Sequence, residues 1–408
     1  MFAGAQAKLA KSGPRKLLAL DGGGIRGLIT IEILAKIESI VREQSRNHSL
    51  VLADYFDYIG GTSTGAVIGT LLALGKPVDE IRRIYLDCGR MMFDKKTIMG
   101  RLEKLGKELP HGLAVLKAAE LSAHYGKRWA GEKEPYAKYP DPPLADKLKE
   151  LVGGDDTTLG TDNLRTLLLL VLSNVTTDSP WPLSNNPRAR YNDPARSNSN
   201  AKFPLWQVVR ASTAAPTYFP PQEIRVGGDT FVFVDGGVTS YNNPSFQLFL
   251  QATLEPYGVM WPAGEKNMLL VSVGTGLHPN AQQGLRSADM HAAAAISTAT
   301  EALFNAAMYQ QDQLCRVFGR CLCGDSLDSE IGDLVGMKGP ADPSRLFTYM
   351  RYNATLTAEG LNGLGLAHIN PKDVESLDSI EHMKELQEVG TAVAERKVKA
   401  EHFTGFGA

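Results

Sequence analysis

The pentapeptide GTSTG, from Gly61 to Gly65, could place a reactive hydroxyl at a tight turn. A G-x-S-x-G pattern between a strand and a helix is typical of a nucleophile elbow, because the glycines allow close packing and the serine projects at the start of the helix. Backbone N–H groups there favour developing negative charge. The alternative is a simple Ser/Thr-rich helix cap. A predicted strand at 55–59 precedes the motif and an uncharged apolar run at 66–74 follows it, so the sequence predicts Ser63 as a nucleophile.

A glycine-rich segment, DGGGIRG at 21–27, could bind a negatively charged oxygen. It too lies between an apolar run and a pattern typical of a helix. Consecutive glycines leave backbone N–H groups bare, so those of Gly22, Gly23 and Gly24 could point into a cavity and form an oxyanion hole. Arg26 would add a fixed positive charge beside them.

The same segment also satisfies the dinucleotide-binding pattern G-x-G-x-x-G. That fold would need an acidic residue ~20 positions later, at the end of a second strand. Glu38 and Glu43 lie near that distance, but within or just after the helix predicted to start at Leu28, and the next strand begins only near Tyr55. The spacing therefore disfavours a dinucleotide site.

Asp235 follows the apolar run FVFV at 231–234 and precedes Gly236 and Gly237. An aspartate at the end of a strand, followed by glycines, can reach a site without crowding it. Taken alone, this segment is more simply a turn. Its importance comes from the other two motifs, because a carboxylate is a candidate general base for the Ser63 hydroxyl.

Strands alternate with helices along the part of the chain that carries these motifs. The runs at 16–20, 167–175 and 268–273 are typical of strands buried on both faces of a parallel sheet. The alternation predicts a layered α/β domain. Residues 281–408 are predicted to be a helical region packed on the same domain, and the proline-rich segment 180–204 a surface loop.

Composition excludes several other classes of protein. Among 408 residues, 43 Lys and Arg nearly balance 45 Asp and Glu, which argues against an electrostatic nucleic-acid binder. The four cysteines are too few for a disulfide framework, and Cys315, Cys321 and Cys323 lack the partners of a zinc site. The N-terminus has no secretory apolar run, and in the uncharged stretch at 58–75 only residues 66–74 are strongly apolar, which is too short to span a membrane. A reduced, cytoplasmic location is predicted.

The three motifs, in this order, resemble those of the patatin-like phospholipase family. DGGGIRG resembles the family's oxyanion-hole motif, GTSTG its nucleophile motif and DGG its catalytic-aspartate motif. Further likeness lies in ASTAAPTYFP at 211–220, in NNP at 242–244 and in VSVGTG at 271–276. The resemblance spans about residues 15–280, which would form the catalytic core.

The resemblance implies a three-layer α/β/α fold with a mostly parallel central sheet. It also implies a lipid acyl hydrolase of the phospholipase A type, in which Ser63 and Asp235 act as a dyad on a phospholipid or another acyl lipid. Neither a metal nor a cofactor is required. Two alternatives remain open: a cyclic-nucleotide-activated effector of bacterial antiphage defence, and a storage-type patatin without activity. The sequence carries no signal for an oligomeric state.

A Ser-Asp-His triad would instead need a histidine after Asp235. The five candidates are His278, His291, His368, His382 and His402. His278 is the attractive one, because it follows a predicted strand end. The family resemblance favours a loop or surface role for it.

Peripheral membrane contact is a further prediction from the segment 82–107. It holds eight Lys or Arg against three acidic residues, with methionines, Phe93 and Ile98 interleaved. Basic and apolar character together suit docking on anionic lipid. The alternative, slightly favoured, is an ordinary pair of amphipathic helices packed on the core.

Overall fold

A single mixed sheet organises the protein. The computed structural model describes residues 1–92, 137–139, 141–279 and 292–407, and within them the sheet has nine strands. Their order is β5-β6-β3-β2-β1-β7-β9-β8, with β4 also paired to β3. The strands are β1 (Arg15–Leu20), β2 (Tyr58–Thr62), β3 (Leu167–Asn174), β4 (Ser179–Ser184), β5 (Gln222–Val226), β6 (Asp229–Asp235), β7 (Met268–Val273), β8 (Arg320–Cys323) and β9 (Thr348–Tyr352).

The sheet is parallel through its centre. β3, β2, β1, β7, β9 and β8 pair in parallel, whereas β4, β5 and β6 form the antiparallel pairings. Every residue of β1 and β7 is buried, as expected where helices cover both faces of a parallel sheet. The predicted three-layer fold with a mostly parallel sheet is confirmed.

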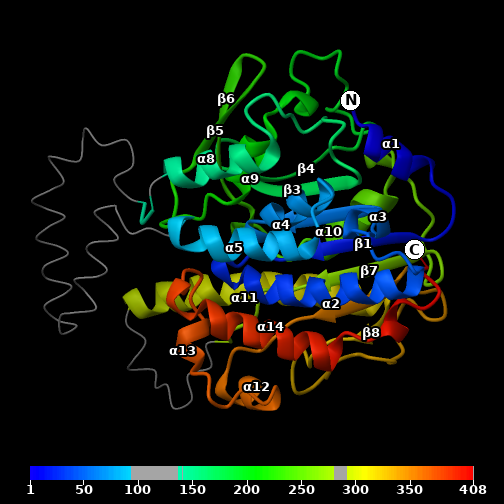
Figure 1. Ribbon diagram of the computed structural model, residues 1–408, viewed down its shortest axis with the longest axis vertical. Helices are drawn as coiled ribbons and strands as arrows, with labels where there is room; N and C mark the ends of the chain where they lie inside the picture. The colour runs from blue at the N-terminus through cyan, green and yellow to red at the C-terminus, as the bar shows by residue number, and fades with distance from the viewer. Residues whose placement is uncertain (93–136, 140, 280–291, 408) are drawn as a thin grey trace, which may run out of the picture.

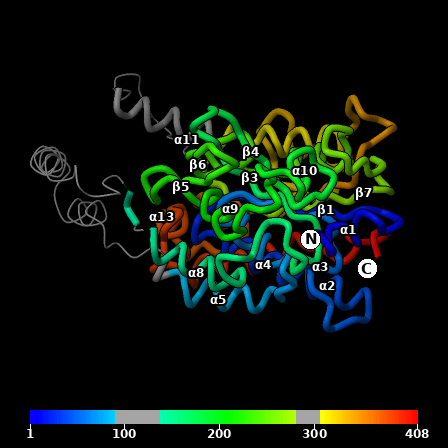
Figure 2. The backbone as a smooth tube through the Cα atoms, turned by 90° about the horizontal axis from the view of Figure 1, so that it is seen from above, coloured from blue at the N-terminus to red at the C-terminus, as the bar shows by residue number. Residues whose placement is uncertain are grey.

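Helices cover the two faces of the sheet, and the sheet separates the apolar core into two clusters. Within β1, Leu18 and Leu20 pack in one apolar cluster while Leu17 and Ala19 pack in the other, because alternate side chains point to opposite faces. Figure 1 shows α2 and α14 running side by side on one face, and Figure 2 shows α4, α5 and α8 on one side of the strands with α10 and α11 on the other. The α-helices are α1 (Ala3–Ala10), α2 (Gly27–Ser45), α3 (Leu52–Tyr55), α4 (Thr64–Ala73), α5 (Val78–Met92), α8 (Asp141–Val152), α9 (Leu205–Ser212), α10 (Ser245–Thr253), α11 (Ala292–Phe318), α12 (Ala358–Gly363), α13 (Pro371–Val374) and α14 (Met383–Lys397).

Three predicted elements differ from the structure. The strand predicted to begin at Tyr55 begins at Tyr58, because the preceding residues form the short helix α3. The segment 180–204, predicted as a loop, contains most of β4, whose two prolines are tolerated because β4 pairs with β3 alone. The C-terminal region is not only helical, since β8 and β9 extend the same sheet.

Strand β3 brings the ends of two other strands together. β2 runs parallel to β3 and ends with Thr62 opposite Val171, whereas β6 runs antiparallel and ends with Asp235 opposite Leu172. β4 pairs with both Val171 and Leu172 and so occupies one edge of β3 at this point. β2 and β6 must therefore both lie along the opposite edge. Their last residues therefore meet end to end, and Ser63 follows directly.

At Gly61 in β2 and Gly65 in α4 there is no room for a side chain. A Cβ atom on Gly61 would lie 2.1 Å from the Gly65 carbonyl oxygen, and one on Gly65 would lie 2.2 Å from the Leu20 carbonyl oxygen. Both neighbours are backbone atoms, so relieving the clash would move β1, β2 or α4 as a whole. The two glycines of the pentapeptide are needed for packing as well as for the turn.

We expect Gly65→Ala to lower the thermal unfolding midpoint, because a methyl group forced into filled space costs about 1–3 kcal/mol. Gly363→Ala is the matched control, since its Cβ would meet nothing within 4 Å. That variant should keep or raise the midpoint. Circular dichroism melts compare them. A wild-type midpoint in Gly65→Ala would mean that α4 can shift away from β1.

Candidate active site

Ser63 is held in an unusual backbone conformation between β2 and α4. Its φ of 54° and ψ of −122° are rarely adopted by residues other than glycine. The Ser63 N–H donates a hydrogen bond to Ser212 Oγ at 3.0 Å, and the Ser212 hydroxyl donates to the Val171 carbonyl at 2.7 Å. Ser212 thus ties the turn to β3.

The Ser63 hydroxyl points at Asp235. Its Oγ donates a hydrogen bond to Asp235 Oδ2 at 2.6 Å. The other carboxylate oxygen, Oδ1, accepts the Gly237 N–H at 2.7 Å. A Cβ atom on Gly236 would lie 2.2 Å from the Val171 carbonyl oxygen, so the turn after β6 packs directly on β3. Both oxygens of the carboxylate are therefore fixed, one of them on the serine.

Burial raises the pKa of Asp235 to about 6. The hydrogen bonds from Ser63 and Gly237 and the positive charge of Arg210 act in the opposite direction, but burial outweighs them. The side chain is almost fully buried, with 4% of its surface exposed. A carboxylate with this pKa is still ionised at neutral pH and is a stronger base than a free aspartate.

Two backbone donors of the glycine-rich loop have no acceptor among the described residues. The Gly22 N–H donates to the Asn242 carbonyl at 3.1 Å, so it is engaged within the protein. The N–H groups of Gly23 and Gly24 donate to no acceptor among the described residues. Both glycines line the same cavity as Ser63. An oxyanion in this cavity would be bound by these two N–H groups rather than by three.

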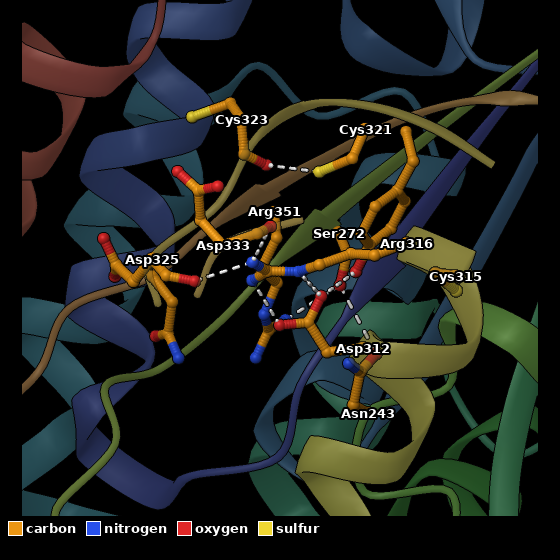
Figure 3. A network of polar contacts seen from close by, with 12 residues as sticks. Asn243, Ser272, Asp312, Cys315, Arg316, Cys321, Cys323, Asp325, Asp333 and Arg351 are labelled. Carbon is orange, nitrogen blue, oxygen red and sulfur yellow. Dashed lines mark hydrogen bonds and ion pairs between the residues drawn. The ribbon is translucent and has the colours of Figure 1, made fainter. Parts of the chain in front are cut away.

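A buried ion pair anchors the start of this loop. Arg351 on β9 donates from both terminal nitrogens to the two carboxylate oxygens of Asp21, at 2.9 and 2.5 Å. Arg351 also donates to Ser272 Oγ at 2.8 Å, and Ser272 donates to Asn243 Oδ1 at 3.3 Å (Figure 3). On the other side, the Thr275 hydroxyl donates to the Gly22 carbonyl at 2.8 Å. The loop is therefore fixed from β7 and β9.

Arg26 adds a positive charge that forms no ion pair with a carboxylate of the described residues. Its Nη1 donates to the carbonyl oxygen of Glu375 at 3.1 Å, and its Nε is shielded from solvent without a hydrogen-bond partner. Burial lowers the pKa of Arg26 to about 10, so the side chain remains a cation at neutral pH. Arg26 lines the cavity, where its charge favours an anionic group.

These groups open into one large cavity of about 890 Å³. Ser63, Asp235 and the glycine-rich loop form part of its wall. Much of the remaining wall is apolar and comes from Val67, Leu144, Phe219, Leu277, Met308 and Leu377. Such a cavity has room for a long apolar chain with a polar group near the serine.

The described histidines make no hydrogen bond with Ser63 or Asp235. His278 lines the cavity, but its Nε2 lies 2.9 Å from Glu375 Oε2 and its Nδ1 lies 3.1 Å from the Leu356 carbonyl oxygen. The ring of His368 contacts Glu388, and that of His402 contacts the Tyr352 hydroxyl. The two ring nitrogens of His382 contact Asp373 and Glu385. His291 lies outside the described residues.

The structure covers only the start of the predicted membrane-docking segment. Arg82 pairs with Glu32 on α2 at 2.8 Å and also with Asp79, so it packs against the core instead of facing a lipid surface. Residues 93–107 lie outside the described residues, and docking there stays a prediction. No helix in the described part of the chain is long and apolar enough to cross a membrane.

Comparison with known proteins decides the family. The model of the patatin-like phospholipase family matches residues 18–249, which is more than half of the chain. The chain belongs to the patatin-like phospholipase family. The matched region holds Ser63, Asp235 and the whole glycine-rich loop. These three features are the ones that the motifs singled out.

Patatin-like relatives occur in bacteria and plants. The cGAMP-activated phospholipase of Vibrio cholerae serotype O1 is 30% identical over 233 residues, covering 57% of this chain and 56% of the relative. Patatin-like protein 1 of Oryza sativa subsp. indica is 31% identical over 293 residues, covering 67% and 60%. The chain thus spans roughly three fifths of these relatives' length. Among solved structures, VipD from Legionella pneumophila matches with a TM-score of 0.36 and 15% identity, covering 92% of this chain and 67% of VipD.

Sequence reasoning missed two residues that fix the glycine-rich loop. Thr275 lies within the VSVGTG segment, but its hydrogen bond to Gly22 could not be read from that segment. Arg351 lies in the region predicted to be helical. A signal was available there, because a single arginine within the apolar run TYMRY at 348–352 is typical of a buried ion pair.

We expect Asp235→Asn to gain stability relative to the wild type as the pH rises. The carboxyl group has a higher pKa in the folded chain, about 6 against 3.8, so its ionisation opposes folding. This cost is absent below pH ~4, grows up to pH ~6 and is constant above. The thermal midpoint of Asp235→Asn minus that of the wild type should follow the same curve. A difference that falls as the pH rises would contradict the raised pKa.

Proposed function

We propose that the chain is a lipid acyl hydrolase of the phospholipase A type that uses Ser63 and Asp235 as a catalytic dyad. The observation that carries the proposal is the 2.6 Å hydrogen bond from Ser63 Oγ to a buried carboxylate in the wall of a large, mainly apolar cavity. A nucleophile in contact with a base, next to free backbone donors, is the arrangement that acyl transfer needs.

The reaction has two halves. Asp235 accepts the Ser63 proton while Oγ attacks the ester carbonyl carbon, and the carbonyl oxygen becomes an oxyanion. When the intermediate collapses, the C–O bond to the alcohol breaks and Asp235 returns the proton to that alcohol. Water then attacks the acyl carbon while Asp235 accepts its proton. The bond from that carbon to Ser63 Oγ breaks and Asp235 returns the proton to Oγ, which releases the fatty acid and restores Ser63.

The glycine-rich loop would stabilise the charge that develops. The N–H groups of Gly23 and Gly24, which have no acceptor among the described residues, would donate to the oxyanion, and the positive charge of Arg26 would strengthen their effect. Fixed donors in a site shielded from water need no rearrangement during the reaction. The apolar walls of the cavity would hold the acyl chain.

Ser63→Ala should abolish release of fatty acid from defined substrates. The wild type is incubated with vesicles of phosphatidylcholine, a galactolipid or a triacylglycerol, and mass spectrometry identifies the acyl chains released. Ser173→Ala on β3 is the matched control, since its hydroxyl makes no hydrogen bond among the described residues. We expect full activity in the control and phospholipid as a substrate. Hydrolysis by a folded Ser63→Ala protein would refute the dyad.

The pH dependence of kcat/KM should identify the base. If Asp235 acts as the base, kcat/KM falls about tenfold per pH unit below pH ~6 and is level above it, because only the ionised carboxylate accepts a proton. His278→Ala should keep this profile and lose less than the ~10²-fold expected for removal of a general base. A collapse of activity in folded His278→Ala, comparable to that in Ser63→Ala, would favour a triad.

A second candidate function is hydrolysis that depends on a cyclic dinucleotide. It is favoured by the similarity to two cGAMP-activated phospholipases, from Vibrio cholerae at 30% identity and from Escherichia coli at 26%. The lipid assay is therefore run with and without cGAMP. Activity in its absence supports the unregulated hydrolase, activity only in its presence supports the regulated enzyme, and no hydrolysis in either arm supports a storage-type protein.

A further inference from the structure

A short C-terminal segment, from Glu375 to Asp378, packs against the glycine-rich loop. The Ile25 N–H donates a hydrogen bond to the Leu377 carbonyl oxygen at 2.8 Å. The contact is close, because a Cβ atom on Gly24 would lie 2.1 Å from the same oxygen. This segment lies beyond both the predicted core, which ends at residue 280, and the family match, which ends at residue 249.

The same segment holds Arg26. Its guanidinium donates to the Glu375 carbonyl oxygen at 3.1 Å, while the Glu375 carboxylate lies 2.9 Å from His278 Nε2. The His278 Nδ1 in turn lies 3.1 Å from the Leu356 carbonyl oxygen. One end of the 375–378 segment is therefore attached to the loop that follows β7.

The other end is clamped through the carboxylate of Asp378. Ser376 Oγ donates to Asp378 Oδ1 at 2.6 Å, and both the Tyr139 hydroxyl and the Lys138 ammonium lie 2.5 Å from Oδ2. Asp378 is buried, with 9% of its surface exposed. Both oxygens of this buried carboxylate are therefore held, one by Ser376 and the other by Tyr139 and Lys138.

The clamp connects to the wall of the active-site cavity. The backbone N–H groups of Lys138 and Tyr139 donate to the carbonyl oxygens of Thr217 and Tyr218, both at 2.8 Å. Tyr218 lines the cavity. Asp378 thus joins the 375–378 segment to the part of the cavity wall that contains Tyr218.

Asp378 remains ionised at any pH at which the enzyme would work. Burial opposes ionisation, but the hydrogen bonds from Lys138, Ser376 and Tyr139 outweigh it and lower the pKa of Asp378 to about 2. Its negative charge is therefore present throughout that range of pH.

We propose that Asp378 is a positioning residue for the oxyanion hole. By fixing the 375–378 segment it would set the direction of the Gly23 and Gly24 N–H groups and the place of Arg26. The physical reason is that glycines have no side chain with which to hold a loop, so the loop depends on outside acceptors for its N–H groups. This inference rests on the proposed function, because it assigns a task within that same site.

The test compares Asp378→Asn with a matched Asp325→Asn control. Asp325 also pairs with a lysine, Lys397, but among the described residues none of its hydrogen bonds reaches the glycine-rich loop or the 375–378 segment. With a soluble short-chain ester, Asp378→Asn should lower kcat by about 10–100-fold and leave KM within about twofold, because misplaced donors weaken only the transition state. Its affinity for a trifluoromethyl ketone, which forms an oxyanion on Ser63, should fall by a similar factor. Asp325→Asn should change none of these values.

Amide hydrogen exchange gives a readout that is independent of hydrolysis. The peptide covering residues 21–27 should exchange faster in Asp378→Asn than in Asp325→Asn, because the Ile25 N–H loses a fixed acceptor. If Asp378→Asn does not fold, Ser376→Ala removes one donor of the clamp and should lower kcat in the same way by a smaller factor, about threefold or more.

The results separate this inference from the proposed function. Wild-type kcat in folded Asp378→Asn, or a rise in KM alone, overturns the positioning role while Ser63-dependent hydrolysis still stands. An unchanged exchange rate for residues 21–27 also overturns it. If the wild type hydrolyses no ester and Ser63 binds no trifluoromethyl ketone, the proposed function fails and the positioning role fails with it.

Discussion

The backbone of Ser63 is the constraint on which the rest of the site depends. A non-glycine residue at φ 54° is strained, and it stays there only if its surroundings allow no alternative. Gly61 and Gly65 bring α4 so close to the sheet that the chain must turn sharply, and Ser212 then binds the Ser63 N–H. Strand β3 sets the remaining distance, because it pairs with both β2 and β6 and so places the end of one beside the end of the other.

Two buried aspartates near this turn have different hydrogen-bond partners. Both oxygens of Asp21 accept hydrogen bonds from Arg351, and this ion pair fixes the start of the glycine-rich loop. Among the described residues Asp235 has no such arginine partner: one oxygen accepts a backbone N–H and the other a hydroxyl, while burial raises its pKa to about 6. Under the proposed mechanism, this difference in partners would leave Asp235 available to accept the Ser63 proton. An arginine in direct contact with Asp235 would stabilise its charge and weaken it as a base.

The sequence predicted the local features of this site well and the distant ones poorly. β1, β3 and β7 are continuous apolar runs, and the turns after β1, β2 and β6 are marked by glycines, so both could be predicted from short stretches of chain. The pairing of Arg351 with Asp21 joins residues 330 positions apart, and no local pattern encodes it. For the same reason the strand pairing of β8 and β9 and the engagement of the Gly22 N–H by Asn242 were found only in the structure.

The groups proposed to react and the groups that hold them in place come from different parts of the chain. Ser63, Asp235 and the glycine-rich loop all lie in the region matched by the family, whereas Thr275, Arg351 and the 375–378 segment lie beyond it. A serine or an aspartate can be fixed by its own side chain, but a backbone N–H can be fixed only by what surrounds the loop. Many different outside contacts can supply that support equally well. A motif that is recognisable by its glycines can therefore be held by segments that carry no recognisable motif at all.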